Sequence, residues 1–281
     1  MASVSVSWNH DPEPLQRSQL RLRLGRIYYT WRRQLQWLAS GTKYACYTYR
    51  NSTLPYLAFT HQTPLLRKLS QVDMQLQYNK ITNLQLAGQT MNGLILKPGE
   101  VFSFWKLVGK PTKRKGYLKG MVLCNGRFDP GTGGGLCQLS NLISWMTLHT
   151  PLTVTERWRH NYDVFPDSNR TQPFGSGATV SYNYIDLQIQ NNTGADYQLL
   201  VWLDDEFLHG EWRCSQPLIY RYRVYEREHI IKAAWWGGYI RSNVLYRKII
   251  NGNGSEVGDE HVCSNRAIMM YQPLLPEKGE T

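Results

Sequence analysis

The spacing of apolar side chains predicts helices in the first third of the chain. Apolar residues recur at steps of three and four at Leu20, Leu24, Ile27, Trp31, Leu35 and Leu38. This is the period of an amphipathic helix. Asp11 or Ser18 is expected to cap its start, and Gly41 to end it.

Two further helices are expected after this first one. Thr63-Pro64 has the form of an N-cap followed by proline at the first helical position. The helical face then continues through Leu65, Leu69, Val72 and Leu76, and a separate short helix is predicted over residues 83–91.

The rest of the chain is predicted to be mainly β, with one helix inside it. Strands are expected at 94–96, 101–105, 152–164, 178–190, 197–203, 218–223 and 244–250, the last turning at Asn251-Gly252-Asn253-Gly254. A helix is expected over residues 136–148. This order predicts an α+β fold with N-terminal helices, followed by a mainly antiparallel β domain with one embedded helix. The chain is expected to divide into a basic N-terminal helical arm (1–62), a central domain (63–205) and a β-rich C-terminal extension packed on that domain (206–281).

The positive charge is concentrated near the N-terminus. The 281 residues carry a net charge of +11, and no acidic residue occurs between Leu15 and Val72. A basic amphipathic helix over residues 15–38 is typical of elements that contact an anionic membrane surface or an anionic partner. The alternative is a helix whose apolar face packs on the protein's own core. No nucleic-acid-binding motif accompanies the charge, so no nucleic-acid partner is expected.

Composition narrows the class of protein further. No segment has the roughly 18 uninterrupted apolar residues of a membrane span, and the first twenty residues lack the apolar core of a signal peptide. Five cysteines without a C-x-x-C pair are typical of a reducing compartment. We therefore expect a cytoplasmic protein, either free or peripheral to the membrane through residues 15–38, with Cys46, Cys124, Cys214 and Cys263 as buried structural thiols. His261-x-Cys263 fits no usual zinc spacing, so neither metal nor cofactor is expected.

Cys137 is the strongest candidate for chemistry. It follows the glycine-rich segment 131–135 and would lie in the first turn of the helix predicted over 136–148. Free backbone N–H groups and the helix dipole at such a position stabilise a thiolate and can hold an oxyanion. Cys137 is therefore a candidate nucleophile, and the alternative is a buried structural thiol behind a glycine turn.

His160 is the candidate general base. On a strand, Trp158, His160 and Tyr162 would share one face, with Arg157 and Arg159 on the other. The alternative for His160 is a partly buried polar residue at a strand end. His149 ends the predicted helix, where a cationic ring would interact favourably with the helix dipole.

Several ordered segments resemble the VanW family. They are PGEVFSFW (98–105), Gly116-Tyr117, GTGGGLCQLSN (131–141), ERWRHNYDV (156–164) and GATVSYNYIDLQIQN (177–191). The resemblance covers roughly residues 63–205. It implies a role in B-type glycopeptide resistance or cell-wall metabolism, and some related domains are associated with L,D-transpeptidase activity.

Carried over by position, the resemblance implies a cysteine-dependent acyl transferase acting on peptidoglycan stem peptides or their precursors. Cys137 would be the nucleophile and His160 the base. Gly133, Gly134, Gly135 and Gln138 are the candidates for oxyanion or substrate binding, together with Arg157 and Arg159. The alternative function is a non-catalytic binding module for cell-wall precursors or resistance-pathway proteins.

Overall fold

The computed structural model describes residues 18–66, 73–124, 127–164, 172–182 and 184–271. The helices are α1 (Gln19–Ala39), α2 (Met74–Met91), α3 (Phe104–Val108) and α4 (Cys137–Leu148), with a 3-10 turn η1 (Lys113–Lys115). The strands are β1 (Tyr56–Pro64), β2 (Leu94–Leu96), β3 (Val101–Ser103), β4 (Lys119–Cys124), β5 (Arg127–Thr132), β6 (Thr153–Glu156), β7 (Tyr162–Asp163), β8 (Gln188–Gln190), β9 (Tyr197–Leu203), β10 (Phe207–Cys214), β11 (Tyr220–Ala233), β12 (Tyr239–Asn251) and β13 (Glu256–Met269).

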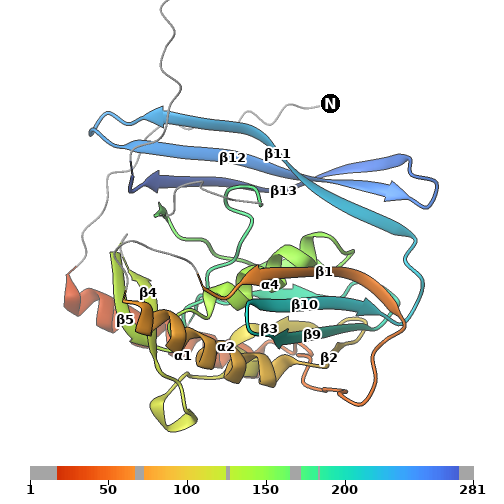
Figure 1. Ribbon diagram of the computed structural model, residues 1–281, viewed down its shortest axis with the longest axis horizontal. Helices are drawn as coiled ribbons and strands as arrows, with labels where there is room; N and C mark the ends of the chain where they lie inside the picture. Colours follow the sequence, from red (N-terminus) through yellow and green to blue (C-terminus); the bar gives the residue numbers. More distant parts are fainter. Residues whose placement is uncertain (1–17, 67–72, 125–126, 165–171, 183, 272–281) are drawn as a thin grey trace, which may run out of the picture.

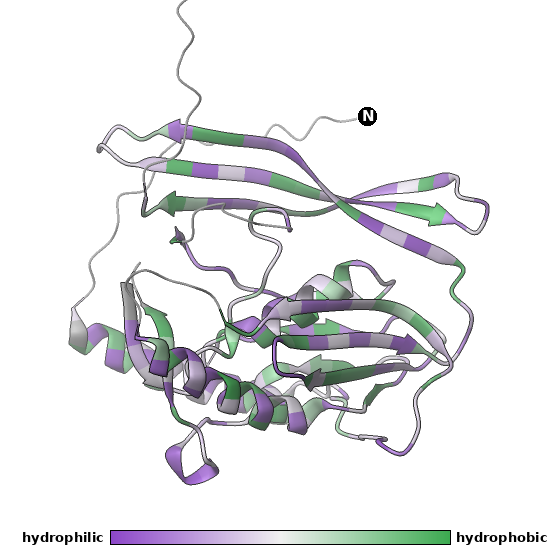
Figure 2. Cartoon of the chain, in the orientation of Figure 1, coloured by the Kyte–Doolittle hydropathy of each residue, from purple (hydrophilic) through white to green (hydrophobic). Residues whose placement is uncertain are grey.

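The α+β prediction is confirmed, with mostly antiparallel sheets. The described strands form sheets in the orders β1-β10-β9-β2, β11-β12-β13-β7, β3-β8-β6 and β4-β5. Figure 1 shows β11, β12 and β13 as a separate layer above the remainder of the fold. Hydrophobic and hydrophilic residues alternate along these long strands (Figure 2), as expected for sheets with one covered face.

The central sheet β1-β10-β9-β2 has two helices on the same face. Gly210 on β10 lies opposite Val201 on β9, so both residues point to one side of the sheet. A Cβ on Gly210 would lie 2.6 Å from the Met146 side chain of α4, whereas a Cβ on Gly88 of α2 would lie 3.5 Å from Val201. The missing side chain at Gly210 therefore lets α4 pack closely on the sheet, whereas a Cβ at Gly88 would make an ordinary van der Waals contact with Val201.

The layer β11-β12-β13 is joined to the remainder of the fold by polar contacts. The Asn243 side-chain amide donates to the Phe174 carbonyl at 2.8 Å, and the Asn265 side-chain amide donates to the same carbonyl at 3.3 Å. Arg247 donates to the Thr150 carbonyl at 2.9 Å. Hydrogen bonds to buried main-chain carbonyls therefore fix the position of this layer.

Helix α1 begins as predicted at Ser18, whose hydroxyl accepts a hydrogen bond from the Arg21 backbone N–H. The side of α1 that contacts the remainder of the fold carries Arg33, whose two terminal nitrogens donate to the Glu156 carboxylate at 2.7 and 2.5 Å. Its apolar stripe, from Leu20 to Leu38, is exposed. The interpretation in which that stripe packs on the protein's own core is therefore wrong.

The helices expected around residues 63–91 differ from the prediction. Thr63 and Pro64 end strand β1 instead of starting a helix. Leu69 and Val72 lie outside the described residues. The helix begins after Asp73, whose side chain accepts from the Gln75 N–H, and continues unbroken as α2 through the segment predicted as a separate helix. The Thr-Pro signal was overridden by pairing of β1 with β10.

Three predicted strands are also shorter than expected. Ser103 caps the short helix α3, so the strand predicted over 101–105 ends at residue 103. The segment 152–164 contains only β6 and β7, with residues 157–161 outside any strand, and 178–190 contains only β8. Strand β9 and helix α4 match their predicted positions. Among the described residues, no helix is long and apolar enough to cross a lipid bilayer.

The Arg33–Glu156 pair gives a test of how α1 is held. Arg33→Ala leaves the half-buried Glu156 carboxylate without its cationic partner, and we expect a loss of about 3 kcal/mol in the free energy of unfolding. Urea denaturation measures this loss. The neighbouring Arg32→Ala removes an exposed guanidinium and serves as the control, with an expected change below about 0.5 kcal/mol. Equal midpoints for the two variants would contradict the anchoring role.

Candidate functional site

Cys137 is the first residue of α4, as predicted from the glycine-rich segment before it. The first N–H groups of any helix lack partners within the helix, which favours an anion at this position. The thiol nevertheless donates to the Val180 carbonyl at 3.5 Å, and burial raises the pKa of the Cys137 thiol. The sulfur is therefore in its protonated form at neutral pH.

Packing explains the three glycines before α4. A Cβ on Gly133 would lie 2.6 Å from Pro111, and one on Gly134 would lie 2.2 Å from the Gly120 backbone. Gly133 and Gly135 also have φ angles of +75° and +92°, which disfavour other residues. The loop is glycine-rich because the backbone of β4 and neighbouring side chains fill the space around it.

Asn83 of α2 holds this loop in place. Its amide nitrogen donates to the Gly134 carbonyl at 2.9 Å and to the Leu118 carbonyl at 3.1 Å, while its oxygen accepts from the Leu118 N–H at 2.9 Å. Sequence reasoning missed this fully buried residue. A signal was present, because Gln77, Lys80 and Asn83 are polar residues three apart on the buried face of α2.

Gln138, predicted to bind substrate, contacts the end of β1 instead. Its amide nitrogen donates to the Thr63 hydroxyl at 3.0 Å and to the Pro64 carbonyl at 2.8 Å. These bonds connect the first turn of α4 to the point where β1 ends. Whether Gln138 also contacts a substrate stays a prediction.

His160 lies in the segment between β6 and β7, not on a strand. Burial lowers the pKa of His160, and the charge of Arg159 lowers it further, so the ring is neutral at pH 7. Within the described residues, no hydrogen bond joins His160 to the Cys137 thiol. The Cys137 thiol contacts Val180, and the backbone of Trp158, two residues before His160, pairs with the neighbouring Thr179.

The two predicted substrate-binding arginines join the C-terminal layer to the segment 174–177. Arg157 donates to the carbonyls of Gly175 and Gly177, to the Cys263 sulfur and to the Asn265 side chain. Arg159 donates to the Arg266 carbonyl, with its guanidinium 4.9 Å from the centre of the Phe174 ring. Burial lowers the pKa of Arg159 to about 10. Both side chains are engaged by the protein itself in this conformation.

Asp186, two residues before β8, is a fully buried carboxylate. Its oxygens accept from the Ser103 hydroxyl at 2.6 Å and from the Trp105 N–H at 3.0 Å. Burial raises the pKa of Asp186 to about 6 against these hydrogen bonds. The backbone N–H of Asp186 donates to the Glu156 carboxylate at 3.4 Å, so Asp186, Glu156 and Arg33 form one connected network.

His149, at the end of α4, is uncharged at neutral pH, contrary to the expected cation. Its ring lies 4.1 Å from the centre of Phe59 and 4.5 Å from that of Trp145. Burial lowers the pKa of His149 to about 4, helped by the charges of His61 and Arg247. Loss of hydration here outweighs the favourable helix dipole.

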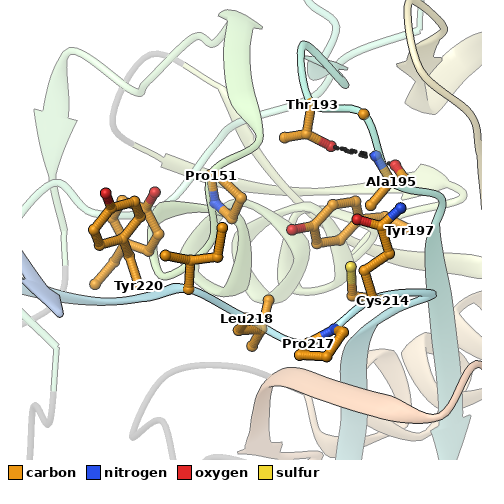
Figure 3. A pocket seen from close by; sticks show the side chains of 12 residues that line it. Pro151, Thr193, Ala195, Tyr197, Cys214, Pro217, Leu218 and Tyr220 are labelled. Carbon is orange, nitrogen blue, oxygen red and sulfur yellow. Dashed lines mark hydrogen bonds between the residues drawn. The ribbon is translucent and has the colours of Figure 1, made fainter. Parts of the chain in front are cut away.

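Two adjacent cavities lie away from Cys137, between the central sheet and the start of β11. One has a volume of about 220 Å³ and is lined by Pro151, Tyr197, Cys214, Pro217, Leu218 and Tyr220, among others. Figure 3 shows the tyrosine and proline side chains around this space. The second, of about 490 Å³, shares Pro217 and Leu218 and extends to Phe59 and His149. Their linings are mainly aromatic and apolar.

The other cysteines occupy different environments. Cys214 is buried as expected, Cys263 is half-buried, and Cys46 is exposed, so the expectation of a buried thiol is wrong for Cys46. The side chain of Cys124 lies outside the described residues. In the described part of the chain, no three histidine, cysteine or acidic side chains are grouped to hold a metal ion.

The fold and site define a class: an α+β protein with a thiol at the start of a helix that follows a clamped glycine loop. The family model described as VanW like protein matches residues 79–213. The chain is 45% identical over 236 residues to the Vancomycin B-type resistance protein VanW of Enterococcus faecalis (strain ATCC 700802 / V583), covering 83% of this chain and 84% of that protein. The chain therefore belongs to the VanW family.

A second relative shares a smaller part. The uncharacterized protein YoaR of Bacillus subtilis (strain 168) is 31% identical over 109 residues, covering 39% of this chain and 34% of that protein. No solved structure shows a significant match.

The packing of the glycine loop predicts that alanine lowers the free energy of unfolding much more at Gly134 than at Gly194. Gly134→Ala forces a Cβ against the Gly120 backbone, which cannot move without disturbing β4, and we expect a loss of about 3 kcal/mol in the free energy of unfolding. Gly194→Ala is the control, because a Cβ there meets nothing within 4 Å. Chemical denaturation of both variants checks this, and a stable Gly134→Ala protein would rule out the packing explanation.

The burial of His149 predicts a pH-dependent stability. Because its folded pKa of about 4 lies below the unfolded value of 6.5, the unfolded chain takes up the proton first as the pH falls. This contribution is complete above pH 6.5 and is lost between pH 6.5 and 4. Relative to wild type, His149→Leu is expected to gain about 2 kcal/mol in unfolding free energy on going from pH 7.5 to 4.5.

The measurement is urea denaturation of both proteins at the two pH values. Taking the difference between proteins removes the opposing contribution of Asp186, whose raised pKa favours the folded state as the pH falls towards 4. His261→Gln, on an exposed residue of β13, is the control. A His149→Leu difference that does not change with pH would show that the ring is already hydrated in the folded protein.

Proposed function

We propose that this chain acts in glycopeptide resistance or cell-wall metabolism. The observation that carries the proposal is the 45% identity, over 84% of its length, to a protein named for B-type vancomycin resistance. A similarity of this extent supports a shared role more strongly than any single motif, because fold alone does not imply function.

For the chemistry, we propose cysteine-dependent acyl transfer on peptidoglycan stem peptides or their precursors. His160 takes the Sγ proton, the Cys137 thiolate attacks the peptide carbonyl carbon, and a thioester forms as the C–N bond breaks. The proton passes to the departing amine, and an acceptor amine then cleaves the thioester and frees the thiol. The helix start at Cys137 and the neutral ring of His160 support these roles.

The burial of Cys137 sets a condition on this chemistry. The thiol donates to the Val180 carbonyl, and its raised pKa disfavours the thiolate. Because the Cys137 residue is only partly buried, acyl transfer requires release of the hydrogen bond to the Val180 carbonyl and approach of the His160 ring to the sulfur. In apo structures, hydrogen bonds between catalytic groups are often absent until the substrate binds.

A second candidate function is a binding module for cell-wall precursors or resistance-pathway proteins. The aromatic cavities beside Tyr197 and Tyr220 favour it, because aromatic and apolar linings are typical of ligand sites. The occupied side chains of Arg157 and Arg159 also suit a structural role. This candidate predicts ligand binding that does not depend on the Cys137 thiol.

Mass spectrometry of the protein with a synthetic stem tetrapeptide tests the acyl transfer. Wild type is expected to form a thioester on Cys137 and release the terminal amino acid. Cys137→Ser is expected to abolish both, and His160→Gln to slow them by about 100-fold or more.

Cys46→Ser, which removes the exposed thiol, is the control and is expected to keep full turnover. Turnover retained in Cys137→Ser would overturn the nucleophile assignment. If wild type shows no turnover but binds the peptide as tightly as Cys137→Ser, the binding module replaces the enzyme. Alkylation of Cys137 can be compared in the same samples with exposed Cys46 and buried Cys214.

A further inference from the structure

Helix α1 exposes its apolar side chains to solvent. The exposed fractions are 68% for Leu20, 58% for Leu24, 57% for Ile27, 64% for Trp31, 60% for Leu35 and 83% for Leu38. We call these six residues the α1 stripe. Single exposed apolar residues are ordinary on protein surfaces, but a continuous stripe marks an interaction site.

The remainder of the fold prevents α1 from turning this stripe inward. Arg33 is fixed by the Glu156 carboxylate and by the Tyr184 carbonyl at 2.7 Å. Trp37 packs against the hydrophobic core, and the Tyr29 ring lies 4.8 Å from that of Tyr184. None of these anchoring residues belongs to the α1 stripe, so the helix is held by one face and exposes the other.

The charges of the described part of α1 are positive only. Arg21, Arg23 and Arg32 are exposed and flank the α1 stripe, Arg26 is exposed on the side of Arg33, and no acidic residue occurs between Leu15 and Val72. A second copy of the chain docked through this face would bring two sets of arginines together without acidic partners. An anionic lipid surface supplies both the negative charge and the apolar layer that this face lacks.

We infer that α1 lies in the headgroup region of an anionic bilayer, with the α1 stripe in the acyl boundary and the flanking Arg21, Arg23 and Arg32 among the lipid phosphates. The Arg33–Glu156 pair then fixes the orientation of the remainder of the protein on the membrane. This inference rests on α1 alone and does not depend on the acyl transfer proposed for Cys137.

Co-sedimentation of the full chain with vesicles tests the inference. Wild type is expected to bind vesicles of phosphatidylglycerol and phosphatidylcholine, more weakly as salt rises, and to bind pure phosphatidylcholine at least about tenfold less. Trp31→Gln/Leu35→Gln removes two members of the α1 stripe without changing charge. It is expected to weaken binding at least about tenfold.

The matched control is Ile219→Gln/Trp235→Gln, which removes two apolar residues that are each 74% exposed outside α1. It is expected to bind the anionic vesicles like wild type. Equal binding by the Trp31→Gln/Leu35→Gln variant and wild type would overturn the inference, as would no binding by wild type. A wild-type dimer in sedimentation analysis that this variant converts to monomer, without vesicle binding, would assign the stripe to a second copy instead.

Discussion

The buried carboxylate of Asp186 is the constraint around which much of this fold is arranged. It is fully buried and needs donors, which come from Ser103 and Trp105 at the β3–α3 junction. Its neighbour Glu156 needs a cation, which comes from Arg33. Segments 98–105, 156–164 and 177–191, three of the segments that resemble the VanW family, meet at this network. The family resemblance therefore records a structural junction at least as much as a catalytic site.

This junction determines which face of α1 is available. An amphipathic helix in a globular protein usually buries its apolar face, since burial of apolar area drives packing. Here a bidentate ion pair and Trp37 hold the opposite arrangement. Exposing the six apolar side chains of the α1 stripe costs about 1.5–3 kcal/mol each, which together exceeds the few kcal/mol at stake in the Glu156 carboxylate. The ion pair therefore sets which face of α1 points inward without offsetting the hydrophobic cost, and a bilayer that covers the stripe removes that cost.

Local signals in the sequence predicted the positions of some helices and strands correctly and those of others incorrectly. Helix α4 and strand β9 were predicted correctly because their periodicity, glycine context and flanking turns agree. The Thr63-Pro64 signal failed because β1 pairs along its whole length with β10, about 150 residues away. The same limit applies to the site: Cys137 has a local signature, whereas the Asn83 clamp and the Arg33–Glu156 pair depend on contacts made only in the folded chain.

The environment of Cys137 combines two opposing effects of different size. A helix start favours an anion by about 0.3–1 kcal/mol at exposed positions, and less than about 2 kcal/mol when partly buried. Removing the thiolate from water costs more than this, so burial decides the sign and the pKa of Cys137 is raised. The pKa of Cys137 falls below its ordinary value only if the sulfur becomes hydrated, or contacts a polar substrate, while it stays at the helix start. Since the thiol donates to the Val180 carbonyl, reactivity at Cys137 depends on release of that hydrogen bond, and the backbone of the neighbouring Thr179 pairs with Trp158, two residues before His160.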